Sequence, residues 1–262
     1  MHFGTVRLTT GPELYYAEYG DEDGEPVVFL HGWPDSWFSY SRVVPLLPQR
    51  IHAFIPDQRG FGDSERPDEG YSIATFADDA AAFMNAMGID RATVVGHSFG
   101  SFVTRQLAHT HPDRVARMIL IGTGVTAVSP ATREAETIVR DLTDPVSEAF
   151  AREFQSSTVH VPLPDAFFEG LLAESLKLPA RLWRETFAAV LAYRDQDRLA
   201  TITAPTLLLW GEHDALFARA DQDELAATIP GATLRIYAET GHCPNWERPE
   251  LVAADILAFV AR

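Results

Sequence analysis

The sequence has only one cysteine, Cys243, among its 262 residues, which excludes an intramolecular disulfide. No group of cysteine and histidine residues has the spacing of a zinc site. Nothing in the sequence therefore indicates an oxidising compartment, a structural metal or a cofactor. The simplest interpretation of Cys243 is a small packed residue.

Basic residues are scarce as well. The chain has 21 lysine and arginine residues against 37 aspartate and glutamate residues, a net charge of −16. A surface of this sign repels phosphate backbones and anionic lipid headgroups, which argues against nucleic acid as a partner. No run approaches the roughly 18 apolar residues of a membrane-spanning helix, and residues 1–10 lack the pattern of a secretory signal. We expect a soluble, cytoplasmic protein, a monomer or homodimer, that takes a small-molecule substrate and binds no membrane.

What is present is the composition of a globular protein. Hydrophobic residues make up 46% of the chain and charged residues 22%, which excludes a disordered protein. The length is near the upper limit for a single hydrophobic core. We therefore expect one domain with an insertion.

Short apolar runs alternate with helical patterns along most of the chain. After a hairpin of residues 5–9 and 13–19, the runs cover 27–30, 53–55, 93–95, 118–121, 206–209 and 234–237. Most are continuous, which is typical of strands buried on both faces. Apolar residues at helical spacing end at Gly88, and another helix starts near Phe99. The pattern predicts an α/β protein with a mostly parallel sheet flanked by helices.

This alternation stops between residues 125 and 200. Helix-like segments at 131–141, 146–155, 165–177 and 180–191 are separated by prolines, without a convincing strand. We interpret residues 125–200 as a helical cap inserted into an α/β core of residues 1–124 and 201–262. Some of its large apolar side chains should roof a cleft. They are Phe154, Phe167, Phe168, Leu171, Leu172, Trp183, Phe187 and Tyr193.

A Gly-x-Ser-x-Gly motif, GHSFG at 96–100, directly follows one apolar run and precedes a helix. A serine on so sharp a turn projects its hydroxyl from the sheet edge, and glycines flank it because side chains there would collide. The helix that follows offers unpaired N–H groups to a developing oxyanion. An incidental serine in a glycine-rich turn is the alternative. The context favours Ser98 as a nucleophile.

A serine nucleophile needs a base, and the base needs an orienting carboxylate. Asp214 and His242 each follow a predicted strand, at the sheet edge where open α/β sheets bind ligands. The chain order Ser98, Asp214, His242 is the order expected for such a site. Glu212 and His213 share the loop of Asp214 but lie closer to the strand end, where solvation is expected.

An oxyanion hole requires two N–H donors. Phe99, directly after the nucleophile, supplies the first candidate, and Trp33 supplies the second because Gly32 lets the backbone turn beneath the site. The Trp33 ring should then contribute to the pocket. The alternative is a tight turn with a tryptophan buried in the core.

Five ordered segments resemble the α/β-hydrolase superfamily across the whole chain. They are HGWPDSW at 31–37, DQRGFGDS at 57–64, GHSFG at 96–100, GEHD at 211–214 and GH at 241–242. The first two are most similar to the epoxide hydrolase and haloalkane dehalogenase branch, whose nucleophile is an aspartate. Because Ser98 stands at that position, the resemblance implies instead an esterase, a lactonase, a carbon-carbon bond hydrolase or a cofactor-free haloperoxidase-like enzyme. Arg59 and Asp63 are expected to pin their loop and not to act in catalysis.

These observations predict a serine hydrolase that cleaves a carboxylic ester or lactone of a small, largely apolar substrate through an acyl-enzyme. The triad would be Ser98, Asp214 and His242, with Trp183 and Phe187 of the cap as substrate-binding residues. The same triad could instead serve carbon-carbon bond hydrolysis, perhydrolysis or cyanohydrin lysis. An alternative of another class is a small-molecule receptor or interaction module that keeps the fold without catalysis.

Overall fold

A computed structural model of the protein describes residues 1–261. Eight strands form one sheet in the order β1-β2-β4-β3-β5-β6-β7-β8. Strand β2 runs antiparallel to both of its neighbours, β1 and β4, and the strands from β3 to β8 are parallel to one another. The strands are β1 (His2–Arg7), β2 (Glu13–Tyr19), β3 (Glu25–Leu30), β4 (Ile51–Pro56), β5 (Ala92–His97), β6 (Val115–Ile121), β7 (Thr206–Gly211) and β8 (Thr233–Tyr237).

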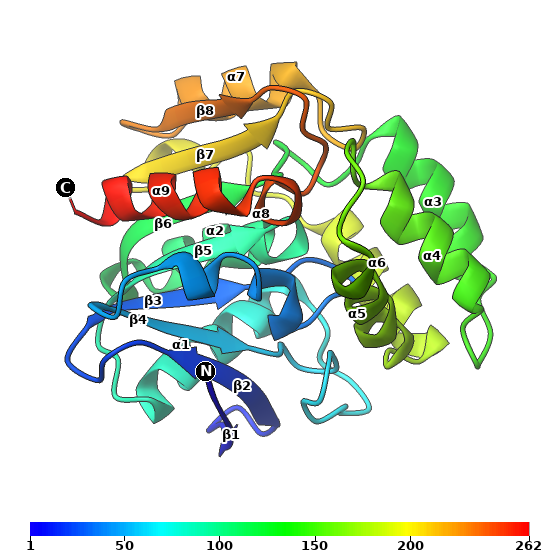
Figure 1. Ribbon diagram of the computed structural model, residues 1–262, viewed down its shortest axis with the longest axis horizontal. Helices are drawn as coiled ribbons and strands as arrows, with labels where there is room; N and C mark the ends of the chain where they lie inside the picture. Colours follow the sequence, from blue (N-terminus) through cyan, green and yellow to red (C-terminus); the bar gives the residue numbers. More distant parts are fainter. Residues whose placement is uncertain (262) are drawn as a thin grey trace.

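Helices cover both faces of this sheet (Figure 1). Successive residues of a strand point to opposite faces of the sheet. Val28 packs on the face covered by α1 and α2, whereas Val27 packs on the face covered by α9. This period of two explains the continuous apolar runs in the sequence, because each parallel strand is buried on both sides. The core helices are α1 (Ile73–Ala86), α2 (Phe99–Thr110), α7 (Arg219–Thr228), α8 (Pro244–Glu247) and α9 (Pro249–Val260).

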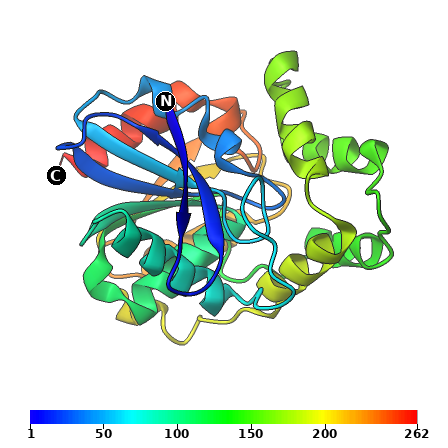
Figure 2. The same cartoon turned by 90° about the horizontal axis from the view of Figure 1, so that it is seen from below.

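Residues 125–200, called here the helical segment, lie between β6 and β7 in the sequence. The structure describes all of them and gives them four α-helices and no strand: α3 (Pro130–Arg140), α4 (Glu148–Ser157), α5 (Asp165–Leu176) and α6 (Ala180–Ala192). These helices gather on one side of the sheet, and the arrows of β3, β4 and β7 point toward them (Figures 1 and 2). The carboxyl ends of the parallel strands therefore face the helical segment.

A buried arginine on α2 contacts both ends of the helical segment. Arg105 donates from Nη1 to the Gly124 carbonyl at 2.6 Å and from Nη2 to the Val125 carbonyl at 3.1 Å. Its Nε lies 2.9 Å from Oδ2 of Asp195, which follows α6, and a second contact joins the two side chains. Both side chains of this ion pair are fully buried. One guanidinium thus fixes the entry and the exit of the segment on the sheet layer.

The α/β class and the mostly parallel sheet predicted from the sequence are confirmed. The largest difference is at the first strand, which was expected at residues 5–9 and spans His2–Arg7. Leu8 donates to the Pro12 carbonyl at 2.9 Å, so the turn begins earlier than the alternation suggested. The four helices of the helical segment begin and end within about two residues of their predicted bounds. No helix among residues 1–261 is long and apolar enough to cross a membrane.

Candidate active site

Ser98 occupies the sharp turn between β5 and α2, with φ 48° and ψ −115°. This positive φ is a strained conformation for a residue with a side chain, and such strain is characteristic of functional sites. The neighbouring glycines are required: a Cβ on Gly96 would lie 2.3 Å from the Gly100 carbonyl oxygen. A Cβ on Gly100 would lie 2.2 Å from the Leu30 carbonyl oxygen. Backbone oxygens of β3 and α2 thus leave room only for glycine on either side of Ser98.

Asp214 follows β7 and is held by its own loop. Its Oδ1 accepts the Leu216 N–H at 2.8 Å and the Phe217 N–H at 3.0 Å. Its Oδ2 lies 2.9 Å from Nδ1 of His242, and neither side chain is more than 3% exposed. One carboxylate oxygen of Asp214 therefore contacts the imidazole of His242, and the other accepts hydrogen bonds from the backbone of its own loop. Glu212, the alternative carboxylate, is exposed.

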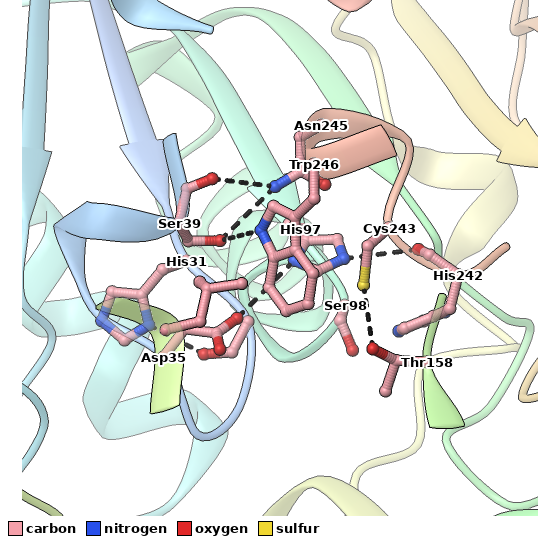
Figure 3. Close-up of polar contacts among 12 residues, drawn as sticks. His31, Asp35, Ser39, His97, Ser98, Thr158, His242, Cys243, Asn245 and Trp246 are labelled. Atoms are coloured by element: carbon pink, nitrogen blue, oxygen red, sulfur yellow. Dashed lines mark hydrogen bonds and ion pairs between the residues drawn. The ribbon is translucent and has the colours of Figure 1, made fainter. Parts of the chain in front are cut away.

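His242 lies between β8 and α8, and its two ring nitrogens have different surroundings. Nδ1 faces Asp214, whereas Nε2 has no hydrogen-bond partner in the part of the chain that the structure describes. Its backbone N–H donates to the Thr158 carbonyl at 2.9 Å, which ties the loop to the helical segment. Figure 3 shows Ser98 between His97 and the loop that carries His242 and Cys243. Because Asp214 orients Nδ1, the free Nε2 is available to a group in the cavity.

The two candidate oxyanion donors come from separate strand ends. Phe99 is the first residue of α2 and Trp33 follows β3; neither backbone N–H has an acceptor in the hydrogen bonds of residues 1–261. The Trp33 loop is braced by His31, whose Nε2 accepts the Gln58 N–H at 3.0 Å while Nδ1 donates to the Gly32 carbonyl at 2.8 Å. Burial lowers the pKa of His31 to about 4, so its ring stays neutral in this role.

Ser98 and His242 line one cavity of about 600 Å³, its open mouth included, at the carboxyl ends of the strands. The walls are predominantly apolar, with the sheet edge on one side and the helical segment on the other. The large apolar residues among them are Trp33, Phe99, Phe102, Phe154, Phe187, Val190, Leu191, Leu216, Phe217 and Trp246.

The two aromatic residues expected to bind substrate have different positions. Phe187 lines the cavity and packs on the Trp33 ring with centroids 4.5 Å apart. Trp183 does not line it: its side chain is fully buried behind Trp33, at 4.8 Å, and its indole N–H donates to the Leu178 carbonyl at 3.0 Å. The structure therefore does not place Trp183 at the cavity wall, because its turn of α6 faces the packed interior.

Sequence reasoning missed several polar residues of the cavity wall, among them Asp35, His97 and Gln155. Asp35 Oδ1 accepts from Gln155 Nε2 at 3.1 Å, and Asp35 Oδ2 lies 4.0 Å from His97 Nδ1. Burial raises the pKa of Asp35 to about 7 and lowers that of His97 well below its usual value. Asp35 belongs to the HGWPDSW segment, and this motif could have indicated that it lies near the site. Gln155 is a residue of α4 and belongs to no motif.

The remaining residues singled out from the sequence have packing or bracing contacts. Cys243 is fully buried, and its thiol lies 3.4 Å from Thr158 Oγ1. Arg59 pairs with Asp79 of α1, with Nη2 and Oδ1 2.8 Å apart. Asp63 accepts from Lys177 Nζ at 2.8 Å. Both loop residues thus attach their segment to a helix or to the helical segment, as expected.

The fold and this arrangement of strand-end residues define an α/β-hydrolase. The family model for the α/β-hydrolase fold matches residues 25–249, and the chain belongs to that family. Membership of this family makes the protein an enzyme of the hydrolase class.

Two curated relatives match nearly the whole chain. A non-heme chloroperoxidase of Streptomyces lividans is 29% identical, over 98% of this chain and 99% of the relative. A soluble epoxide hydrolase of Corynebacterium sp. (strain C12) is 28% identical, over 97% of this chain and 96% of the relative. These two names describe different reactions, so the relatives alone do not select one.

Solved structures match the fold closely at lower identity. The enol-lactonase from Burkholderia xenovorans LB400 has a TM-score of 0.88 and 22% identity, with 99% of this chain and all of that chain covered. An esterase from Exiguobacterium antarcticum has a TM-score of 0.88 and 21% identity, with both chains covered completely. At these identities the likeness establishes the fold.

Proposed function

We propose that the protein is a serine hydrolase that cleaves a carboxylic ester or lactone of a small, largely apolar substrate through an acyl-enzyme. The observation that carries this proposal concerns His242. Its Nδ1 is bonded to the buried carboxylate of Asp214, while Nε2, without a partner among residues 1–261, belongs to a ring that lines the same cavity as Ser98. A ring held in this way can serve as the general base for a serine hydroxyl.

In the proposed reaction, His242 takes the Ser98 proton as Ser98 Oγ forms a bond to the substrate carbonyl carbon. The proton then passes to the leaving oxygen, the ester carbon-oxygen bond breaks, and an acyl-enzyme remains. Water loses a proton to the same ring and attacks the acyl carbon; the acid leaves as Ser98 regains its proton. Asp214 keeps the ring in one tautomer and stabilises the imidazolium.

The oxyanion of each tetrahedral intermediate would be bound by the backbone N–H groups of Trp33 and Phe99. Their lack of acceptors in the described chain supports this role, because these donors can bind substrate without breaking a hydrogen bond within the protein. One such donor contributes about 2.7 to 4 kcal/mol to the transition state in a related type of site. The helix that starts at Phe99 adds positive potential at the same point.

The walls of the cavity support a preference for uncharged substrates of modest size. We propose that the helical segment acts as a cap, because Phe154, Phe187 and Leu191 supply one side of the cavity. Burying an ionised group against such a wall without a partner costs several kcal/mol. Short and medium acyl or lactone groups should therefore react better than long-chain lipids or free dicarboxylates.

Covalent labelling combined with an ester series tests this function. A fluorophosphonate should modify the wild-type protein once, at Ser98, and abolish hydrolysis of p-nitrophenyl esters of graded chain length. The variant Ser157→Ala, which removes an exposed serine of α4, should be labelled and inhibited like the wild type. Ester hydrolysis that survives complete labelling, or an adduct at another serine, would overturn the proposal.

The identity to a non-heme chloroperoxidase supports a second candidate on the same site. In perhydrolysis, hydrogen peroxide replaces water in the attack on the acyl-enzyme and a peracid is released. The peracid oxidises added bromide to hypobromite and returns to the carboxylic acid, so this reaction predicts bromination of a dye that depends on an added carboxylic acid, on peroxide and on bromide. The ratio of this rate to the ester hydrolysis rate decides which of the two activities dominates.

A further inference from the structure

Three side chains with metal-binding atoms meet on the surface beside the active-site loops. His160 lies between α4 and α5 of the helical segment, His213 directly precedes Asp214, and Glu239 follows β8. One ligand atom from each of the three lies within 4.8 Å of the others. The two imidazole rings stack with centroids 3.9 Å apart and planes 15° from parallel.

Both rings direct a nitrogen at the same carboxylate. His160 Nε2 lies 3.3 Å from one oxygen of Glu239, and His213 Nε2 lies 3.7 Å from the other. All three side chains are open to solvent, with exposed fractions of 36%, 42% and 71% for His160, His213 and Glu239. An ion could therefore enter without opening the fold, and water could complete its coordination.

The two histidines and the glutamate favour a transition-metal ion. Two imidazoles and one carboxylate are typical ligands of Zn²⁺, at about 2.0 to 2.2 Å from the metal. Ca²⁺ and Mg²⁺ prefer sets made entirely of oxygen atoms, so a single carboxylate here does not suit them. The three residues lie far apart in the sequence, which is why no local spacing motif indicated the cluster.

Buried hydrogen bonds hold the ligand-bearing segments in place. Glu247 accepts the N–H groups of His160 and Val161 on one oxygen, both at 2.9 Å, and the Gly241 N–H on the other, also at 2.9 Å. The His213 N–H donates to the Thr240 carbonyl at 2.8 Å. Because these backbones are already fixed, binding a metal would order only side chains, which lowers its entropic cost.

We propose that His160, His213 and Glu239 form a binding site for Zn²⁺ that joins the helical segment to the two loops carrying Asp214 and His242. The site does not depend on the proposed hydrolase reaction. Its effect is mechanical: His160 lies two residues after Thr158, which lines the cavity, whereas His213 and Glu239 lie in the loops that carry Asp214 and His242. Zinc bound at this site links the helical segment to these two loops.

Calorimetric titration of the full-length protein with Zn²⁺ tests the proposal. We expect one ion per chain, with affinity reduced at least tenfold in each of the variants His160→Ala, His213→Ala and Glu239→Gln. The matched control is His111→Ala, because His111 forms an exposed pair with Asp78 at 3.1 Å, apart from this cluster. This control should bind zinc like the wild type. Circular dichroism should show that all four variants fold, since the changed side chains are exposed or partly exposed.

Three further measurements separate this site from the active site and test its mechanical effect. The variant His242→Gln should keep the zinc affinity, because its ring is not a proposed ligand. In the wild type and in His111→Ala, zinc should raise the melting temperature and slow amide exchange at residues 158–161. In the three ligand variants, zinc should change neither. Zinc affinity that is unchanged in the three ligand variants, or lost in His242→Gln, would overturn the proposal. So would zinc binding without protection at residues 158–161.

Discussion

The sheet edge and the helical segment form opposite walls of one cavity, but they position their residues differently. At the sheet edge, Ser98, Asp214 and His242 each follow a strand, and tight turns and backbone hydrogen bonds fix their directions. In the helical segment, Phe154 and Phe187 reach the cavity through packing against other side chains. Short sequence motifs therefore identify the first wall, whereas the second depends on which side of each helix faces inward.

After loss of the nucleophile itself, the largest effect in this comparison should come from the carboxylate of the sheet edge. Asp214→Asn keeps the shape of the side chain but favours the wrong tautomer of His242, and kcat should fall on the order of 10⁴-fold near neutral pH. The control is Glu212→Gln, which changes an exposed carboxylate of the same loop and should leave kcat within about twofold. Steady-state ester hydrolysis measures both. A larger loss of kcat in Glu212→Gln than in Asp214→Asn would identify Glu212 as the orienting acid.

The attachment of the helical segment should show a smaller effect, on stability. Arg105→Leu leaves the buried Asp195 without its main partner, and the free energy of unfolding should fall by about 3 to 5 kcal/mol. Arg133→Ala removes an exposed pair with Glu136 within the same segment and should cost about 1 kcal/mol or less. Denaturant unfolding measures the difference. Equal losses would mean that Arg105 does not anchor the segment.

Phe187 and Trp183 of α6 should have different effects on substrate selectivity. Phe187→Ala enlarges the cavity and should shift the preferred acyl length, by about 1 to 3 kcal/mol in relative kcat/KM for each methylene. Trp183→Ala creates a void behind Trp33 and should lower stability while leaving the order of preference unchanged. The ester series measures both outcomes. A folded Trp183→Ala variant with a changed preference would restore Trp183 as a substrate-contacting residue.

The smallest expected effect concerns the pH dependence of stability. Burial raises the pKa of Asp35 to about 7, so the folded protein binds its proton more tightly than the unfolded chain does. Stability from this proton is present at low pH and is lost as pH rises through the folded pKa. Relative to Asp35→Asn, the wild type should lose about 1 kcal/mol between pH 6 and pH 8. A difference that stays flat over this range would show that Asp35 does not titrate between pH 6 and pH 8 in the folded protein.

Much of the fold was predictable because its determinants are local. Parallel strands buried on both faces produce continuous apolar runs, and the prolines between the helices of the helical segment mark their ends. The strand ends that carry Ser98, Asp214 and His242 could be predicted for the same reason, since the turns require glycines and the strands are unmistakable. Their catalytic roles stay predictions.

Contacts between distant segments were not predictable. Helical spacing identifies Trp183 as apolar but does not reveal that Phe187, one turn later, is the residue that lines the cavity. The bond from Gln155 to Asp35 depends on how α4 packs over the sheet edge. The cluster of His160, His213 and Glu239 depends on three surface loops that meet only in the folded chain.

The most direct test of the central claim, that the sheet edge supplies the chemistry, is the rate of ester hydrolysis by Ser98→Ala. The substitution removes only the hydroxyl at a turn whose shape the flanking glycines determine, so the fold and melting temperature should be retained. Removing one member of a cooperating triad costs on the order of a millionfold in kcat. We predict a rate near background and no fluorophosphonate adduct. A rate above about a tenth of wild type would contradict it and assign the nucleophile elsewhere.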